Sequence, residues 1–176
     1  MSHSLAALLF DLGDTIMLEE TEVKDDQGTT LQAELVPGMP GALRQFKALG
    51  HRLALVADAY PDTPPNVLRQ HGLYDLFDAF AISAVVGVSK PDPCIFRVAL
   101  DALGIAAGDY GRVVMVGNNL ERDVVGANRL GLISVLFRVN ERRRTRPLTE
   151  DEIPRHTATS AQELVALIER LDRYSI

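Results

Sequence analysis

The stretch Leu5-Ala-Ala-Leu-Leu-Phe-Asp11 decides the fold of this 176-residue chain, because it joins a short apolar run directly to a carboxylate. Consecutive apolar residues without polar alternation are typical of a strand that is covered on both faces, as in a parallel sheet. A carboxylate directly after such a strand lies at the edge where open α/β sheets bind their ligands. The stretch therefore predicts a buried strand with a functional group at its end.

Further apolar runs of similar length follow along the chain, at Arg52–Ala57, Ala79–Ser83, Arg112–Val116 and Ile133–Phe137. Helix-length amphipathic segments lie between and after these runs, at Pro40–Leu49, Asp92–Leu103, Leu120–Leu130 and Ala161–Leu171. Proline near the start and glycine after the end mark helix boundaries, and Asp92 and Ser160 are expected to be N-caps. This order predicts an α/β fold with a doubly wound, mostly parallel, Rossmann-like sheet.

Two polar segments interrupt the alternation. Residues 17–37 carry the turn signal Lys24-Asp-Asp-Gln-Gly28 and are predicted to form a small β-hairpin flap. Residues 140–160 are predicted to form a polar loop, in which the basic run from Arg142 to Arg146 is typical of a solvated surface. We expect one domain spanning residues 1–176, with these two segments as its insertions.

Composition excludes several classes of protein. The chain has 18 Lys+Arg and 24 Asp+Glu, a formal net charge of −6, so we expect neither nucleic acid nor an anionic membrane as partner. Cys94 is the single cysteine, which excludes a disulfide framework. The longest apolar run is far shorter than the roughly 20 residues that cross a bilayer, and Met1–Ser4 is too short and uncharged for a signal peptide. We expect a cytoplasmic protein, and the oligomeric state stays open.

Polar groups follow the predicted strands. Because the carboxyl ends of parallel strands share one sheet edge, we expect these groups to converge. Carboxylates, amide oxygens and a lysine together suit a divalent cation held next to a phosphate. The residues are Asp11, Asp58, Lys90, Asn118, Asn119 and Asp123.

Four motifs occur in an order that resembles the haloacid dehalogenase superfamily. They are Phe10-Asp-Leu-Gly-Asp-Thr-Ile16, Leu53-Ala-Leu-Val-Ala-Asp58, Val88-Ser-Lys-Pro-Asp-Pro93 and Val116-Gly-Asn-Asn-Leu-Glu-Arg-Asp123. The match covers nearly the whole chain, and four motifs in order are far more specific than one short string. The resemblance implies a Rossmann-like core and phosphoryl transfer to or from a phosphorylated substrate.

The resemblance also implies roles for individual residues. Asp11 would attack phosphorus and form an aspartyl-phosphate that water then hydrolyses. Mg2+ would be held by Asp11, the Gly13 carbonyl, Asn118 and Asp123, directly or through water. Lys90 would neutralise the nucleophile and the phosphoryl oxygens.

The chain departs from the family pattern at the acid-base position. The family's phosphatases usually carry a second aspartate two residues after the nucleophile, where this chain has Gly13. Asp14 follows it, and two readings stay open. Either Gly13 lets Asp14 swing into the catalytic role, or Asp14 only caps the turn.

Phosphate binding and metal binding also depart from the pattern. Ala57, Asp58 and Asn119 stand with Lys90 where phosphate contacts are expected, but Ala57 replaces a Ser or Thr and offers no hydroxyl. Asp58 would repel a phosphate unless it pairs with a cation or points away. Asn118 replaces an aspartate, so the metal loses a negative ligand and should bind more weakly.

Three functions remain open. The first is a Mg2+-dependent phosphatase acting through Asp11, and the second is a phospho-ligand-binding or regulatory protein that has lost catalysis. The third and weakest is a 2-haloacid dehalogenase, in which Asp11 attacks carbon without a metal. Relatives with that activity close the site with a helical cap, whereas residues 17–37 leave room only for a hairpin.

Overall fold

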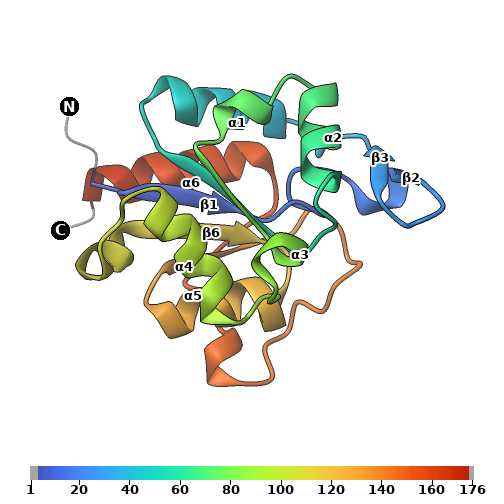
Figure 1. The fold of residues 1–176 in the computed structure, drawn as a ribbon. Coiled ribbons are helices and arrows are strands. Elements are labelled where there is room, and N and C mark those ends of the chain that lie inside the picture. Colours follow the sequence, from blue (N-terminus) through green and yellow to red (C-terminus); the bar gives the residue numbers. More distant parts are fainter. Residues whose placement is uncertain (1–3, 175–176) are drawn as a thin grey trace.

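A six-stranded parallel sheet forms the centre of the molecule (Figure 1). Its order is β5-β4-β1-β6-β7-β8, and neighbouring strands pair in parallel throughout. The strands are β1 (Ala7–Phe10), β4 (Leu53–Ala57), β5 (Ala79–Ile82), β6 (Val113–Gly117), β7 (Ile133–Phe137) and β8 (His156–Ala158). The computed structural model describes residues 4–174, so the segment before Ser4 lies outside it. The predicted α/β fold is confirmed.

Helices cover both faces of the sheet, which explains why its strands lack polar alternation. Leu8 and Phe10 pack with α1 (Met39–Ala48) and α6 (Ala161–Tyr174). On the opposite face, Leu9 packs with α4 (Pro93–Ala102) and α5 (Val125–Leu130). Figure 1 shows these two helical layers on either side of β1 and β6.

The predicted helix boundaries follow from local capping. The Asp92 carboxylate accepts a hydrogen bond from the Cys94 N–H at 2.8 Å, and Pro93 is the first residue of α4. The Ser160 hydroxyl accepts a hydrogen bond from the Glu163 N–H at 3.2 Å, so Ser160 is the N-cap of α6. Gly131 ends α5 with a left-handed φ of 77°. These short-range signals therefore act in the fold as the sequence predicts.

The segment predicted as one helix at 120–130 is divided. Its first part, η4 (Leu120–Val124), is a π-helical turn, and α5 begins only at Val125. The Asn119 side chain accepts from the N–H groups of Glu121 and Arg122, while the Asp123 carboxylate folds back to the Asn119 N–H at 3.0 Å. This wider turn directs Asp123 toward the end of β6.

The predicted flap is a two-stranded antiparallel hairpin of β2 (Val23–Lys24) and β3 (Thr30–Gln32), preceded by the short 3-10 turn η1 (Glu19–Thr21). It lies beside α2 (Thr63–Gln70), a helix that the sequence did not predict (Figure 1). The Thr30 N–H donates to the Thr63 hydroxyl at 3.1 Å, and Asn66 Nδ2 donates to the Thr30 carbonyl at 3.0 Å. The flap is thereby fixed to the domain.

Other short elements complete the chain and were not predicted. They are α3 (Ser83–Val86), η2 (Tyr74–Leu76), η3 (Ala107–Arg112) and η5 (Glu150–Glu152). β8 lies within residues 140–160, which were predicted to be a loop. The sequence does not reveal this strand because it is only three residues long and contains no apolar run. Between residues 4 and 174, no helix has the length and apolarity that crossing a bilayer requires.

Candidate active site

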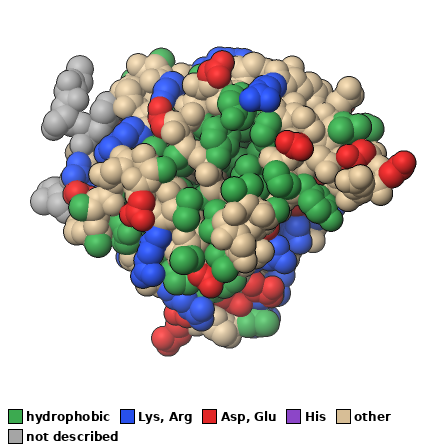
Figure 2. Space-filling model, viewed as in Figure 1, with side chains coloured by type: hydrophobic (Ala, Val, Ile, Leu, Met, Phe, Trp, Pro, Cys, Tyr) green, Lys and Arg blue, Asp and Glu red, His purple; other side chains and the backbone are tan. Residues whose placement is uncertain are grey.

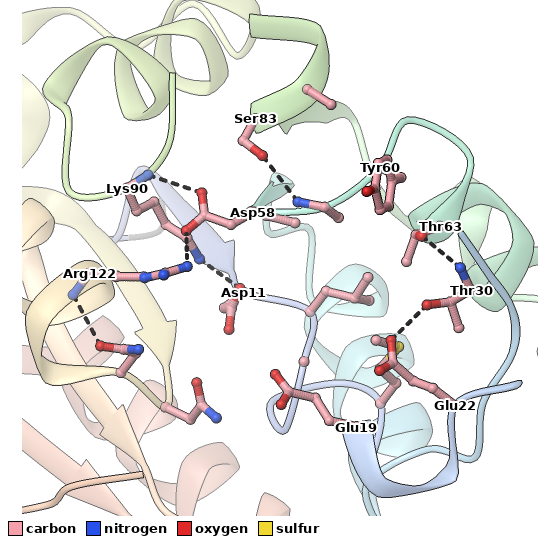
Figure 3. A pocket seen from close by; sticks show the side chains of 18 of the residues that line it. Asp11, Glu19, Glu22, Thr30, Asp58, Tyr60, Thr63, Ser83, Lys90 and Arg122 are labelled. Atoms are coloured by element: carbon pink, nitrogen blue, oxygen red, sulfur yellow. Dashed lines mark hydrogen bonds and ion pairs between the residues drawn. The ribbon is translucent and has the colours of Figure 1, made fainter. Parts of the chain in front are cut away.

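A cavity of about 530 Å3 opens at the carboxyl edge of the sheet (Figure 3). The loops after β1, β4 and β6 form its floor, and the flap and α2 form one side. The topology brings the predicted site residues together there, with one exception, Asp14. Those that line the cavity are Asp11, Gly13, Ala57, Asp58, Lys90, Asn118, Asn119 and Asp123.

Lys90 lies between two carboxylates at the floor of the cavity. Its Nζ donates to Asp11 Oδ1 at 2.6 Å and to Asp123 Oδ1 at 2.7 Å. Burial alone would lower the pKa of Lys90, but the charges of Asp11 and Asp123 outweigh it and raise that pKa, so the lysine is a cation. Burial and the Asp11 charge raise the pKa of Asp123 to about 7, against the opposing effect of Lys90.

The Asp123 carboxylate packs directly against the end of β6. A Cβ built on Gly117 would overlap Asp123, so any larger residue there would displace the carboxylate. Asp123 is 1% exposed. Gly117 is therefore required by this close approach.

Asp58 is paired and does not present a free charge to the cavity. Its Oδ1 accepts from the Lys90 backbone N–H at 3.0 Å, and its Oδ2 accepts from Arg122 Nη1 at 3.1 Å (Figure 3). Next along the chain, the Ala59 N–H donates to the Ser83 hydroxyl at 3.1 Å. Asp58 thus positions the lysine loop, and the repulsion expected for a lone carboxylate is reduced by two donors.

Asp14 is not among the residues that line the cavity and is fully buried. Its backbone is left-handed, with φ 47°, and its Oδ1 accepts from the Glu19 N–H at 3.0 Å. Its Oδ2 lies 3.3 Å from Arg142 Nε and makes no hydrogen bond within residues 4–174. Of the two readings left open by the sequence, this geometry favours the turn cap.

Glu19 lines the cavity beside Gly13, and the motifs in the sequence did not point to it. A Cβ built on Gly13 would overlap Glu19 Oε1 and would lie 2.9 Å from Glu19 Cγ. Arg143 Nη2 donates to both Glu19 oxygens, at 3.0 and 3.2 Å. A carboxylate therefore fills the space left by the absent side chain of residue 13. In the sequence, the one hint of this arrangement is that a glycine at position 13 is followed by several acidic residues in the flap.

The arginines from Arg142 to Arg144 form ion pairs with other parts of the chain, which the prediction of a solvated loop did not include. Arg142 lies by Asp14, and Arg143 lines the cavity. Arg144 Nη1 donates to Glu152 at 2.7 Å, and its Nη2 donates to Glu121 at 2.7 Å. Figure 2 shows basic and acidic side chains gathered together in the lower part of the view, where this loop runs in Figure 1. The run ties the C-terminal loop to the edge of the site.

The floor of the cavity offers oxygen donors for a hard divalent cation, from Asp11, Asp123, Asn118 and the Gly13 carbonyl. Asn118 is buried, and its amide nitrogen has no hydrogen-bond partner in the described part of the chain. Within residues 4–174 there is no group of three His, Cys, Asp or Glu side chains placed around a metal position. The donor set has two carboxylates and otherwise neutral oxygens, a type that Mg2+ accepts.

The chain is similar in sequence to curated proteins that hydrolyse phosphate esters. A glyceraldehyde 3-phosphate phosphatase of Methanopyrus kandleri is 29% identical over 135 residues, which is 77% of this chain and 57% of that protein. A pyrimidine 5'-nucleotidase of Escherichia coli is 33% identical over 138 residues, 77% of this chain and 59% of that protein. The chain thus spans under two thirds of the length of these relatives.

A solved structure and a family model agree on the fold. A HAD phosphatase from Thermococcus onnurineus has a TM-score of 0.76 and 20% identity, covering 93% of this chain and 98% of that one. The model for haloacid dehalogenase-like hydrolases matches residues 3–131. That segment includes Asp11, Lys90 and the turn that carries Asp123. The chain therefore belongs to the haloacid dehalogenase-like hydrolase family.

Proposed function

We propose that this protein is a Mg2+-dependent phosphatase that cleaves phosphate monoesters through an aspartyl-phosphate on Asp11. The observation that carries the proposal is the buried Lys90 cation, which bridges Asp11 and Asp123 at the floor of an open cavity. The names of the curated relatives, a phosphatase and a nucleotidase, support the same class of substrate.

Asp11 is the nucleophile in this proposal. One carboxylate oxygen attacks phosphorus, the phosphorus–oxygen bond to the leaving group breaks, and water later cleaves the acyl-phosphate. A carboxylate approaches a phosphate dianion only when positive charge offsets the repulsion, and Lys90 supplies such a charge 2.6 Å from Asp11. Ala57, Asp58 and Asn119 border the position where the phosphoryl group would lie.

Asp11, Asp123, Asn118 and the Gly13 carbonyl would hold the metal. When bound, Mg2+ would neutralise phosphoryl charge and polarise the phosphorus–oxygen bonds. The bound cation would also favour the ionised form of Asp123.

A phosphate-release screen with and without Mg2+ tests the proposal. We expect wild-type protein to release phosphate from simple monoesters only with Mg2+, and Asp11→Asn to release none above background. Equal activity in wild type and Asp11→Asn would refute Asp11 as the nucleophile.

A second candidate is a phospho-ligand-binding protein without turnover. It is favoured by Ala57, which offers no hydroxyl, and by Asp14, which does not line the cavity. It predicts that BeF3− with Mg2+ raises the thermal midpoint of the wild type although no substrate is hydrolysed.

A further inference from the structure

The cavity is larger than a phosphoryl group needs. Its volume is about 530 Å3, and cavities of about 300–1,000 Å3 hold a drug-sized organic molecule. In the phosphatase function proposed above, on which this inference rests, the phosphoryl group lies beside Asp11 and Lys90 at the floor. The remaining space therefore belongs to the alcohol part of the substrate, and the residues around it determine which alcohol is accepted.

An aromatic ring borders this remaining space. Tyr60 lies in the loop between β4 and α2, lines the cavity and is 53% exposed. Figure 3 shows it on the same side of the cavity as Thr63 and the flap, across from Lys90. A substrate with its phosphoryl group at Lys90 would thus extend its alcohol toward this ring.

The surrounding backbone holds the ring in place. The Ala59 N–H donates to the Ser83 hydroxyl at 3.1 Å, and the Thr63 N–H donates to the Tyr60 carbonyl at 3.2 Å. At the tip of the flap, a Cβ built on Gly28 would lie 3.3 Å from Tyr60 Cε2, so the flap backbone lies next to one edge of the ring. The ring is therefore in position before a ligand binds, which reduces the entropy cost of binding.

The charged groups on the flap side of the cavity are paired. Glu22 pairs with Lys24 at 2.9 Å and accepts from the Thr30 hydroxyl at 2.6 Å. Glu19 pairs with Arg143 at 3.0 Å. A charged alcohol would compete with one of these ion pairs, whereas an uncharged alcohol leaves them intact. This side of the cavity therefore favours an uncharged leaving group.

We propose that Tyr60 determines the specificity of the site, and that the substrate is a phosphate monoester of an uncharged alcohol that carries an aromatic ring. The ring of the substrate stacks on Tyr60 while its phosphoryl group lies beside Asp11 and Lys90. Contacts between aromatic rings favour binding by about 2- to 10-fold beyond the burial of apolar area. Because the stacked ring is remote from phosphorus, it binds the ground state and the transition state alike, and Tyr60 acts on KM.

The test compares 2-phenylethyl phosphate with 2-cyclohexylethyl phosphate, two esters of primary alcohols with rings of similar size. Only the phenyl ring is aromatic. With Mg2+ present, we expect the wild type to have a kcat/KM about 3- to 10-fold higher on the phenyl ester, mainly through a lower KM. Tyr60→Leu should lower this ratio to about one, and Tyr60→Phe should keep it. A variant that folds poorly loses activity on both esters alike, so the ratio reports stacking.

A control variant and a third ester complete the test. Leu31→Ser changes an exposed residue of the flap that does not line the cavity, and it should keep the ratio of the wild type. The ester 2-(4-carboxyphenyl)ethyl phosphate keeps the aromatic ring and adds a negative charge. We expect its kcat/KM to be lower than that of the phenyl ester.

Each outcome bears on a definite claim. Equal kcat/KM values for the phenyl and cyclohexyl esters, or a preference that survives in Tyr60→Leu, would overturn the role of Tyr60, although the phosphatase function stands. Faster hydrolysis of the carboxylated ester would overturn the uncharged class of alcohol. If the wild type with Mg2+ cleaves none of these esters, the proposed function fails, and this inference fails with it.

Discussion

Lys90 shows how a single side chain can hold the site together. It is 4% exposed and contacts Asp11 and Asp123, which belong to loops after different strands. A buried charge is stable only when it is paired and hydrogen-bonded, and here each charge depends on the others. The lysine therefore stabilises the cluster in which the two carboxylates lie together.

We predict that Lys90→Met lowers the free energy of unfolding by about 3–5 kcal/mol, because it leaves two carboxylates together without a cation. Urea unfolding at neutral pH measures the loss. Lys47→Met is the matched control, because Lys47 pairs with Asp78 at 2.6 Å where both side chains are about one third exposed. That pair should contribute about 1 kcal/mol or less. Equal losses in the two variants would contradict the account.

The sequence predicts which residues line the cavity when they directly follow a buried strand. Asp11 and Asn118 are such residues, because the apolar run fixes the strand and the topology fixes where it ends. Glu19 and Arg143 escaped prediction because they come from polar segments without periodicity. Their contact joins positions 124 residues apart, and no local pattern specifies it.

At the scale of elements, the packing of α5 on α4 depends on one glycine. A Cβ built on Gly126 would overlap the ring of Phe96, which is fully buried. This contact holds the helix that follows the Asp123 turn against the sheet. The position therefore favours a residue without a side chain, although glycine is a poor helix former.

We predict that Gly126→Ala destabilises the protein. Alanine gains up to about 1 kcal/mol in helix propensity, but overpacking against a fixed ring costs about 1–3 kcal/mol. Thermal or urea unfolding checks the sign. Gly111→Ala is the control, because a Cβ on Gly111 would meet no atom within 4 Å and little change is expected. A stabilised Gly126→Ala would show that α4 and α5 move apart freely.

Element prediction succeeded where burial imposes a pattern. All five apolar runs became strands, and Asp92, Ser160 and Gly131 mark helix ends as expected. The missed elements have other causes. The Pro64-Pro65 pair at the start of α2 resembles a loop, and β8 is a short strand at the sheet edge with one buried residue, Ala158. Such elements are fixed by tertiary contacts, which the local sequence does not show.

At the scale of the whole molecule, the loop from β7 to β8 is tied back to the site region. Arg144 joins Glu152 in that loop to Glu121 in η4. The hydrogen bond from Arg144, with one from the Leu148 N–H, lowers the pKa of Glu152 from 4.5 to about 2. Ionised Glu152 is thus favoured by the folded state.

This linkage predicts a defined dependence of stability on pH. Between about pH 4.5 and 2 the unfolded chain binds a proton at Glu152 that the folded protein does not, so the stabilisation is complete above this window and is lost as the pH falls through it. The difference in unfolding free energy between wild type and Glu152→Gln should shrink across the window. The difference between wild type and Arg144→Gln should shrink in the same way. Urea unfolding at several pH values measures both differences. A difference that stays constant with pH would contradict the linkage.

The most direct test of the central claim is a rapid acid quench during turnover of a phosphate ester with a radiolabelled phosphoryl group, in the presence of Mg2+. The account predicts label bound covalently to the wild-type protein, on the peptide that contains Asp11, and none on Asp11→Asn. Release of labelled phosphate by the wild type without any protein-bound label would contradict an aspartyl-phosphate at Asp11.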